Sequence, residues 1–159
     1  MTKKLIILLL TLTILLFSAC SKESKFGIEE LCLRTNDTFG TTYDSRSFFK
    51  GKNDANEFLF LEYMNNLISV SVNDKNQITS ISVLFTNEQD IAVGIKCFYE
   101  LCCTFTSNDQ TTQQAIFNSY NITADKIKFT DNTQKVIVGK YKYTVICNEL
   151  SVTLFCERI

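Results

Sequence analysis

Two long stretches of the chain alternate apolar and polar residues with a period of two, and this alternation most constrains the fold. The first stretch runs from Glu57 to Phe85 and the second from Val136 to Cys156. Neighbouring side chains of a strand point to opposite faces, so a period of two predicts strands with one buried face. Each stretch is therefore expected to form an antiparallel unit with one apolar side.

The first stretch contains two turn signals. A two-residue type I′ turn at Asn65-Asn66 suits residues that tolerate positive φ, and it pairs Tyr63 with Ile68. A three-residue loop at 74–76, with Asn76 in the left-handed region, then returns a third strand to the first two. The expected apolar face consists of Leu59, Leu61, Ile68, Val70, Val72, Ile81, Val83 and Phe85.

The second stretch repeats this arrangement near the C-terminus. A type II′ turn at Gly139-Lys140, with Gly at the first central position, pairs Val138 with Tyr141. A tight turn at Asn148-Glu149 brings in a third strand and puts Cys156 opposite Tyr141. The stretch thus predicts a second three-stranded meander with one apolar face.

Helical spacing of apolar residues separates the two stretches and precedes the first. It predicts helices over 25–34, with Ser24 as the cap, over 88–105, and over 110–120, where Ser107 and Gln110 have capping-box spacing.

Two segments have no clear period. Residues 36–56 are expected to form a loop with one helical turn at 44–49, and 127–130 is a short-strand candidate. The resulting fold class is α+β, with two antiparallel three-stranded meanders (helix-βββ, then helix pair-βββ) and helices packed on one sheet face. At 159 residues, the chain is sized for one such domain, over 26–159.

This order of elements over 26–159 resembles the β-lactamase-inhibitor-like fold and the small outer-membrane-assembly lipoproteins that share it. The likeness rests on order and spacing, not on a residue motif. It implies a binding module and transfers no site residues.

The N-terminus has the layout of an export signal. Lys3 and Lys4 precede an apolar run over 5–17, which is too short for a bilayer span of about 30 Å. The segment from Leu16 to Cys20 resembles the lipobox of bacterial lipoproteins, in which a Cys after two small residues is acylated. Phe17 departs from that pattern, which usually has Leu three places before the Cys.

The resemblance implies a signal peptide over 1–19 and a lipidated tether over 20–25, with Cys20 as the site of lipidation. The alternative is an ordinary cleaved signal, which Phe17 disfavours because that peptidase needs a small residue there. We expect a cell-membrane protein that is lipid-anchored on the extracytoplasmic side.

Composition excludes several function classes. With no His, the chain cannot build a Ser-His-Asp system or an imidazole zinc site, and its five Gly form no phosphate loop. No Cys-x-x-Cys pair is present, so neither a metal nor a redox cofactor is expected. A net charge of −1 with scattered lysines offers no patch for nucleic acid.

Six cysteines follow Cys20, an even number that in an exported protein allows three disulfides with 15 connectivities. In the expected register Cys147 and Cys156 lie roughly 20 Å apart along a sheet, too far to bridge. Neighbouring Cys102 and Cys103 point about 100° apart on a helix. Any bridge must join a helix cysteine to a strand or to Cys32, and the alternative is a set of buried, reduced thiols.

The outward face of the first meander carries serines and, unexpectedly, aromatic residues. Phe58 and Phe60 form the candidate interaction face, suited to an envelope protein or a glycan. Cover by residues 36–56, which bring Phe39, Phe48 and Phe49, is the favoured interpretation, and the exposed face is the alternative. Leu84 and, in the second meander, Phe155 also point outward.

Two functions from different classes remain open. The favoured one is a non-catalytic binding or interaction lipoprotein of the cell envelope. The alternative is a histidine-free cell-wall hydrolase, which needs two converging carboxylates. The acidic candidates Glu62, Glu88, Asp90 and Glu149 are dispersed in the sequence.

Overall fold

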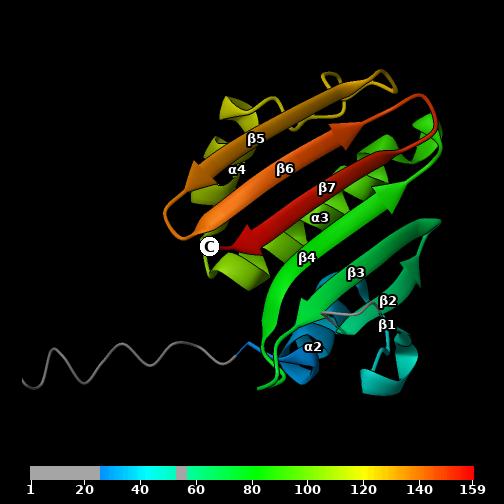
Figure 1. The fold of residues 1–159 in the computed structure, drawn as a ribbon, viewed down its shortest axis with the longest axis vertical. Coiled ribbons are helices and arrows are strands. Elements are labelled where there is room, and N and C mark those ends of the chain that lie inside the picture. Colours follow the sequence, from blue (N-terminus) through cyan, green and yellow to red (C-terminus); the bar gives the residue numbers. More distant parts are fainter. Residues whose placement is uncertain (1–25, 53–56) are drawn as a thin grey trace, which may run out of the picture.

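The computed structural model describes residues 26–52 and 57–159, and for 49–52 and 57–61 it describes the backbone alone. The α+β class is confirmed: α-helices lie on one side of a single antiparallel sheet (Figure 1). The sheet has seven strands in the order β1-β2-β3-β4-β7-β6-β5. The first residue of the helix predicted over 25–34 and its predicted cap, Ser24, lie outside the described residues, as do the predicted signal peptide and tether.

The first half of the chain begins with a helix and continues through four strands of the sheet. Its elements are α2 (Ile28–Phe39), the 3-10 turn η1 (Ser45–Ser47), β1 (Phe49–Lys52), β2 (Glu57–Tyr63), β3 (Asn66–Val72) and β4 (Ile78–Phe85). The second half contains η2 (Glu88–Asp90), α3 (Ile91–Thr106), α4 (Gln110–Ser119), β5 (Asn132–Val138), β6 (Tyr141–Cys147) and β7 (Val152–Arg158).

The strands of the two halves join into one sheet, because β4 pairs with β7 in antiparallel register. Val83 lies opposite Leu154 and Ile81 opposite Cys156 at this junction. Sequence periodicity could not predict this pairing, because β4 and β7 are far apart in the chain. The sheet therefore spans both halves without a break (Figure 1).

The β2–β3 turn lies one residue earlier than expected. Met64 and Asn65 hold the positive φ angles of 46° and 61°, and Tyr63 pairs with Asn66 instead of Ile68. Asn66 is buried, and its side-chain amide donates to the backbone oxygens of Tyr63 and Met64. These two hydrogen bonds favour Asn66 as the first residue of β3 and not as a turn residue. The pairing register of β2 with β3 is therefore shifted by two residues, which keeps every side chain on its expected face.

The β6–β7 register is also shifted by two residues. Cys156 lies opposite Tyr143, not Tyr141, because the turn spans residues 148–151. The Asn148 side chain accepts hydrogen bonds from the backbone N–H groups of Leu150 and Ser151, which stabilises this longer turn. The β5–β6 hairpin has the expected pairing of Val138 with Tyr141, with Gly139 at φ 60°.

Three further expectations were wrong. Part of the expected loop over 36–56 is regular: α2 continues to Phe39, and β1 adds an edge strand. Residues 127–130 form no strand. Asp109, not Ser107, caps α4 by accepting from the Thr112 N–H, since Ser107 is left-handed at the end of α3.

All three helices of the described residues pack on one face of the sheet and form the core with it (Figure 1). α3 lies closest, with Gly94 against Phe85 of β4. α4 adds Phe117, whose ring stacks on Phe98 of α3 at 5.6 Å between centroids. α2 covers the first half, where Phe39 meets Tyr63 of β2.

Candidate functional site

The sheet side that faces away from α2, α3 and α4, here called the open face, is the largest candidate surface. The alternation along each strand decides which residues lie there. The structure describes side chains on this face from six strands, and those of the first five are Glu62 (β2), Leu67, Ser69 and Ser71 (β3), Ser80, Ser82 and Leu84 (β4), Lys142, Thr144 and Ile146 (β6), and Thr153, Phe155 and Glu157 (β7). On the edge strand β5, Thr133, Lys135 and Ile137 complete it.

Phe155 occupies the middle of the open face. It lies between Ser82 on β4 and Thr144 on β6 in one row across the sheet. Ser82 and Thr144 are buried although no described helix covers them, and Phe155 is half-buried. The ring therefore shields its two small neighbours and leaves part of its own surface to solvent.

Paired serines line the β3–β4 part of the open face. The hydroxyls of Ser69 and Ser82 lie 2.5 Å apart, and Ser80 donates to Ser71 over 2.9 Å. Because each hydroxyl has a partner on the neighbouring strand, this part of the face is polar yet already hydrogen-bonded.

Aliphatic side chains flank these serines. Leu67 is 38% exposed and Ile146 is 37% exposed, and both lie in the row that also contains half-buried Leu84. Ile137 on β5 is 61% exposed. The described charged residues of the open face are Glu62, Lys135, and Lys142 with Glu157, which form an ion pair across β6 and β7.

Phe58 and Phe60 belong to β2, and their side chains lie outside the described residues. Their backbone positions pair with Ser71 and Ser69, which places both at open-face positions. Phe49 of β1 pairs with Phe60. Strand spacing of about 4.8 Å puts position 60 roughly 14 Å from position 155, with the two serine strands between them.

The expected cover over Phe58 and Phe60 involves side chains that lie outside the described residues, those of 49–52 included. Phe39 contacts Tyr63 on the helix side, and Phe48 is buried. β1 lengthens the sheet at its edge instead of crossing it. Residues 53–56 lie outside the described part.

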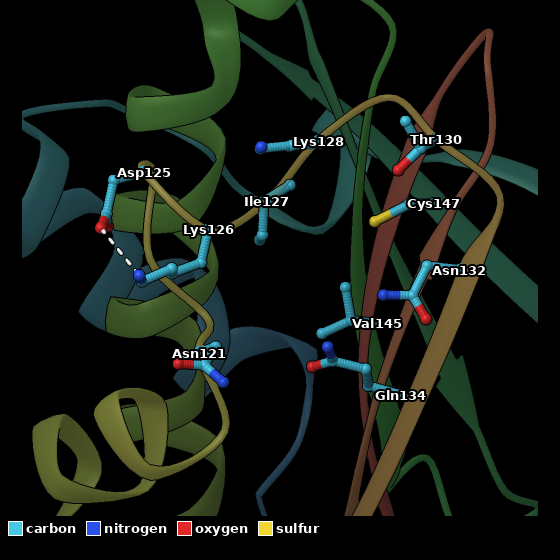
Figure 2. Close-up of a pocket in the computed structure, with 10 residues that line it drawn as sticks. All are labelled: Asn121, Asp125, Lys126, Ile127, Lys128, Thr130, Asn132, Gln134, Val145 and Cys147. Atoms are coloured by element: carbon cyan, nitrogen blue, oxygen red, sulfur yellow. Dashed lines mark ion pairs between the residues drawn. The ribbon is translucent and has the colours of Figure 1, made fainter.

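A second candidate is a hollow of about 350 Å³ between the loop over 121–130 and the helix side of β5 and β6, called the β5 hollow (Figure 2). Val145, Cys147 and Ile127 give it an apolar floor. Its polar lining residues are Asn121, Asp125, Lys126, Lys128, Thr130, Asn132 and Gln134.

Cys147 is the nucleophilic group of the β5 hollow, but it is poorly activated. Burial raises its pKa, although a hydrogen bond from the Lys128 backbone N–H acts in the opposite direction. Lys126 is 3.9 Å from Asp125, which reduces its pull on an anionic ligand. The β5 hollow thus has the shape of a small-molecule site without an activated reacting group.

Two of the dispersed acidic candidates meet in a third place. Glu88 and Glu149 line one open hollow of about 480 Å³ together with Phe129. Both glutamates are exposed. Sequence reasoning missed this proximity because Glu149 lies in the β6–β7 turn, and only the β4–β7 pairing brings that turn near η2. Glu62 lies apart from them on β2.

The fourth place is a buried cluster where α3, α4 and two strands meet. Cys102 of α3, Gln113 of α4, Tyr143 of β6 and Cys156 of β7 form this thiol cluster, and all four are buried. The Tyr143 hydroxyl donates to Gln113 Oε1 over 3.3 Å. Burial raises the pKa values of Cys102 and Tyr143, so both remain protonated at neutral pH.

The described residues contain no group of three His, Cys, Asp or Glu side chains arranged to hold a metal ion. None of the described helices combines the length and hydropathy that a membrane span requires. Cys20 lies outside the described residues. Comparison with protein family models, curated proteins and solved structures gave no match to the chain.

Proposed function

We propose that this chain is a lipid-anchored, extracytoplasmic binding module of a bacterial envelope, without catalytic activity. The observation that carries the proposal is the open face: its aliphatic and aromatic positions have no covering element among the described residues. Exposed apolar residues gathered on one face are typical of a surface that another molecule covers.

The proposal includes the finer arrangement of the domain. Each half contains three strands linked by hairpins after its helical segment, β2 to β4 in one and β5 to β7 in the other, and the first half also has the edge strand β1. Their layout resembles the β-lactamase-inhibitor-like fold. The open face crosses both halves at the β4–β7 pair and therefore offers one continuous surface.

The membrane anchor is Cys20, on the strength of the lipobox-like segment from Leu16 to Cys20. A tether over 20–25 reaches at most about 20 Å. It enters the domain at Phe26, whose backbone oxygen accepts from the Ile78 N–H beside the β3–β4 turn. The anchor thus attaches at one end of the strands, which leaves the open face free to meet a partner.

Metabolic labelling with a fatty-acid probe tests the anchor. The wild-type chain should take up the label and the Cys20→Ser variant should lose it, because the thiol that accepts the lipid is absent. Equal labelling of both chains would overturn the anchoring proposal, as would a wild-type chain that takes up no label.

The partner is proposed to be an envelope protein with an apolar contact surface. Leu67, Leu84 and Ile146 are aliphatic and suit the apolar centre of a protein interface. The serine hydroxyls already bond one another, so they contribute fewer free donors than a glycan site needs. Binding to a glycan instead is an outcome that the experiment can detect.

Capture from envelope extract tests the open face with matched variants. Leu67→Ser should reduce the amount of captured partner, and Phe58→Ser and Phe60→Ser should do the same. Leu33→Ser is the control, because Leu33 is 59% exposed on α2, on the other side of the sheet. All variants should keep the wild-type melting temperature.

Three outcomes decide between the possibilities. Loss of a captured protein in the open-face variants, with capture retained in Leu33→Ser, supports the proposal. Capture that is unchanged in every open-face variant removes the open face as the binding surface. Retention of isolated cell-wall glycan, lost with the same variants, would replace the protein partner with a carbohydrate.

One observation supports the alternative function, a cell-wall hydrolase: Glu88 and Glu149 line the same hollow. Such an enzyme needs one carboxyl to donate a proton and the other to act as base or nucleophile. Solubilisation of purified cell wall by the wild-type chain, lost in Glu88→Gln and in Glu149→Gln, would establish this function. No solubilisation by the wild-type chain would exclude it.

A further inference from the structure

Two of the buried cysteines come together although they lie about 54 residues apart in the sequence. Cys102 sits on the sheet-facing side of α3, and Cys156 sits on the helix-facing side of β7. α3 packs against β7 closely enough for backbone Cα atoms of the two elements to lie within 8 Å. Both residues are free thiols in this structure, and neither is exposed.

Contacts on both sides align the two residues across the interface of α3 with the sheet. Gly94 of α3 lies against Phe85, which pairs with Val152 of β7, and the ring of Phe105 packs on Tyr141, which pairs with Arg158. Cys102 and Cys156 lie between these two contacts, and the interaction with Cys156 is among the causes that raise the pKa of the Cys102 thiol. Tyr143 pairs with Cys156 across β6 and β7, and its hydroxyl bonds to Gln113. The packing of α3, β6 and β7 therefore places the two buried thiols close together.

The other described cysteines have different neighbours. Cys103, next to Cys102 in the chain, interacts with Tyr99 one helical turn earlier. Cys147 lines the β5 hollow together with Ile127. Cys147 and Cys156 lie on neighbouring strands, but Cys156 is paired with Tyr143 and Cys147 with Val152. Neither Cys103 nor Cys147 is therefore placed against Cys156 in the way that Cys102 is.

We propose that Cys102 and Cys156 form a disulfide bond that ties α3 to β7. Both S–H bonds break and one S–S bond forms, which releases two protons and two electrons. The electrons go to the disulfide of a dithiol–disulfide oxidoreductase of the envelope, or to oxidised glutathione in the test tube, which becomes two thiols.

The bond should form during folding and not afterwards. Thiol–disulfide exchange needs a thiolate that an oxidant can reach, and both thiols are shielded in the folded domain. The folded, reduced protein should therefore oxidise much more slowly than the refolding chain. The proposed extracytoplasmic location matters to this inference in one way, because it supplies the oxidant in the cell.

Refolding and peptide mapping test the pairing. The full chain, purified in detergent, is reduced and unfolded and then refolded with reduced and oxidised glutathione. Free thiols are alkylated, and the chain is cut after Lys and Arg and after Glu. Cleavage after Glu100 and Glu149 places the two cysteines in separate peptides, 101–126 and 150–157.

Mass spectrometry should find peptide 101–126 linked to peptide 150–157 as the dominant pair. Because peptide 101–126 also contains Cys103, matched variants complete the assignment. The link should persist in Cys103→Ser and disappear in Cys102→Ser. A dominant link to another cysteine peptide, or no link after refolding, would overturn the proposal.

The same mapping on cells whose thiols were trapped before lysis separates this inference from the proposed location. A link found in both samples supports the disulfide and an oxidising compartment together. A link found after refolding but absent in cells supports the pairing and counts against the extracytoplasmic location.

Discussion

The two faces of the sheet follow the same alternation but serve different purposes. On the helix side, Ile81, Val83, Phe85, Leu154 and Cys156 are completely shielded from solvent. On the open face, the neighbouring residues of the same strands are serines, threonines and partly exposed apolar residues. The comparison indicates that the helix side supplies the stability of the fold, whereas the open face can change with little cost to folding.

A charge on each face of β4 is the harshest test of this difference. Val83 lies between Ile68 and Leu154 with no exposed surface, so Val83→Asp buries an unpaired carboxylate. The cost is several kcal/mol, against a total stability of about 5–15 kcal/mol. We expect Val83→Asp to lack a cooperative urea transition when it is followed by circular dichroism.

The neighbouring variant Leu84→Asp is the control. Leu84 points to the open face and is only half-buried, so the same charge should reduce the free energy of unfolding by about 1 kcal/mol. If both variants unfold, or if both behave like the wild type, the assignment of the two faces is wrong.

Reduction of the proposed Cys102–Cys156 bond should have the next largest effect. A cross-link that closes a loop of about 55 residues stabilises a domain by about 4 kcal/mol, through lost freedom of the unfolded chain. Urea unfolding of the oxidised protein, with and without a thiol reductant, measures this difference. The double variant Cys102→Ala/Cys156→Ala should show no dependence on reductant, and a wild-type chain that is equally insensitive would contradict the prediction.

Added volume should be tolerated on one face and not on the other. In Gly94→Ala, a Cβ on α3 would lie 2.5 Å from Phe85 Cδ1 and 2.8 Å from Asn66 Oδ1. The crowding should outweigh the better helix propensity of Ala and destabilise the domain by about 1–3 kcal/mol. Ser71→Val on the open face adds more side-chain volume, yet its thermal midpoint should stay near the wild-type value. A loss as large as that of Gly94→Ala would show that this face is also packed.

Alkaline pH should weaken the helix side through Cys97. Burial on α3 raises the pKa of this thiol from 9.0 to about 12, so the folded state holds the proton more tightly than the unfolded state. The resulting stabilisation is complete below pH 9 and is lost as the pH rises towards 12. Urea midpoints between pH 8 and 11 should fall more steeply for the wild type than for Cys97→Ala, and parallel curves would contradict this cause.

Periodicity was a sound guide to the faces but not to the turns. The β2–β3 and β6–β7 registers differ from the expected ones by two residues, which returns each side chain to the same face. Hydrogen bonds between the side chains of Asn66 and Asn148 and the backbone determine where the two turns lie. A pattern of apolar residues cannot predict such bonds.

Sequence patterns could not predict the contacts between segments that are far apart in the chain. The β4–β7 pairing joins the halves, and it also brings Glu149 to Glu88 and positions Cys156 for α3. The sequence identified Phe155 and Leu84 as outward-facing, and the structure places both on the open face. It missed the aliphatic residues Leu67, Ile137 and Ile146, although the same alternation assigns them to that face.

Photocrosslinking in living cells tests the central claim, that the open face is the binding surface, most directly. Benzoylphenylalanine is introduced in place of Ser71 on the open face or in place of Leu33 on α2, each in the full lipid-anchored chain. The account predicts a partner adduct from position 71 and none from position 33. An adduct from position 33 alone, or none from position 71, would contradict it.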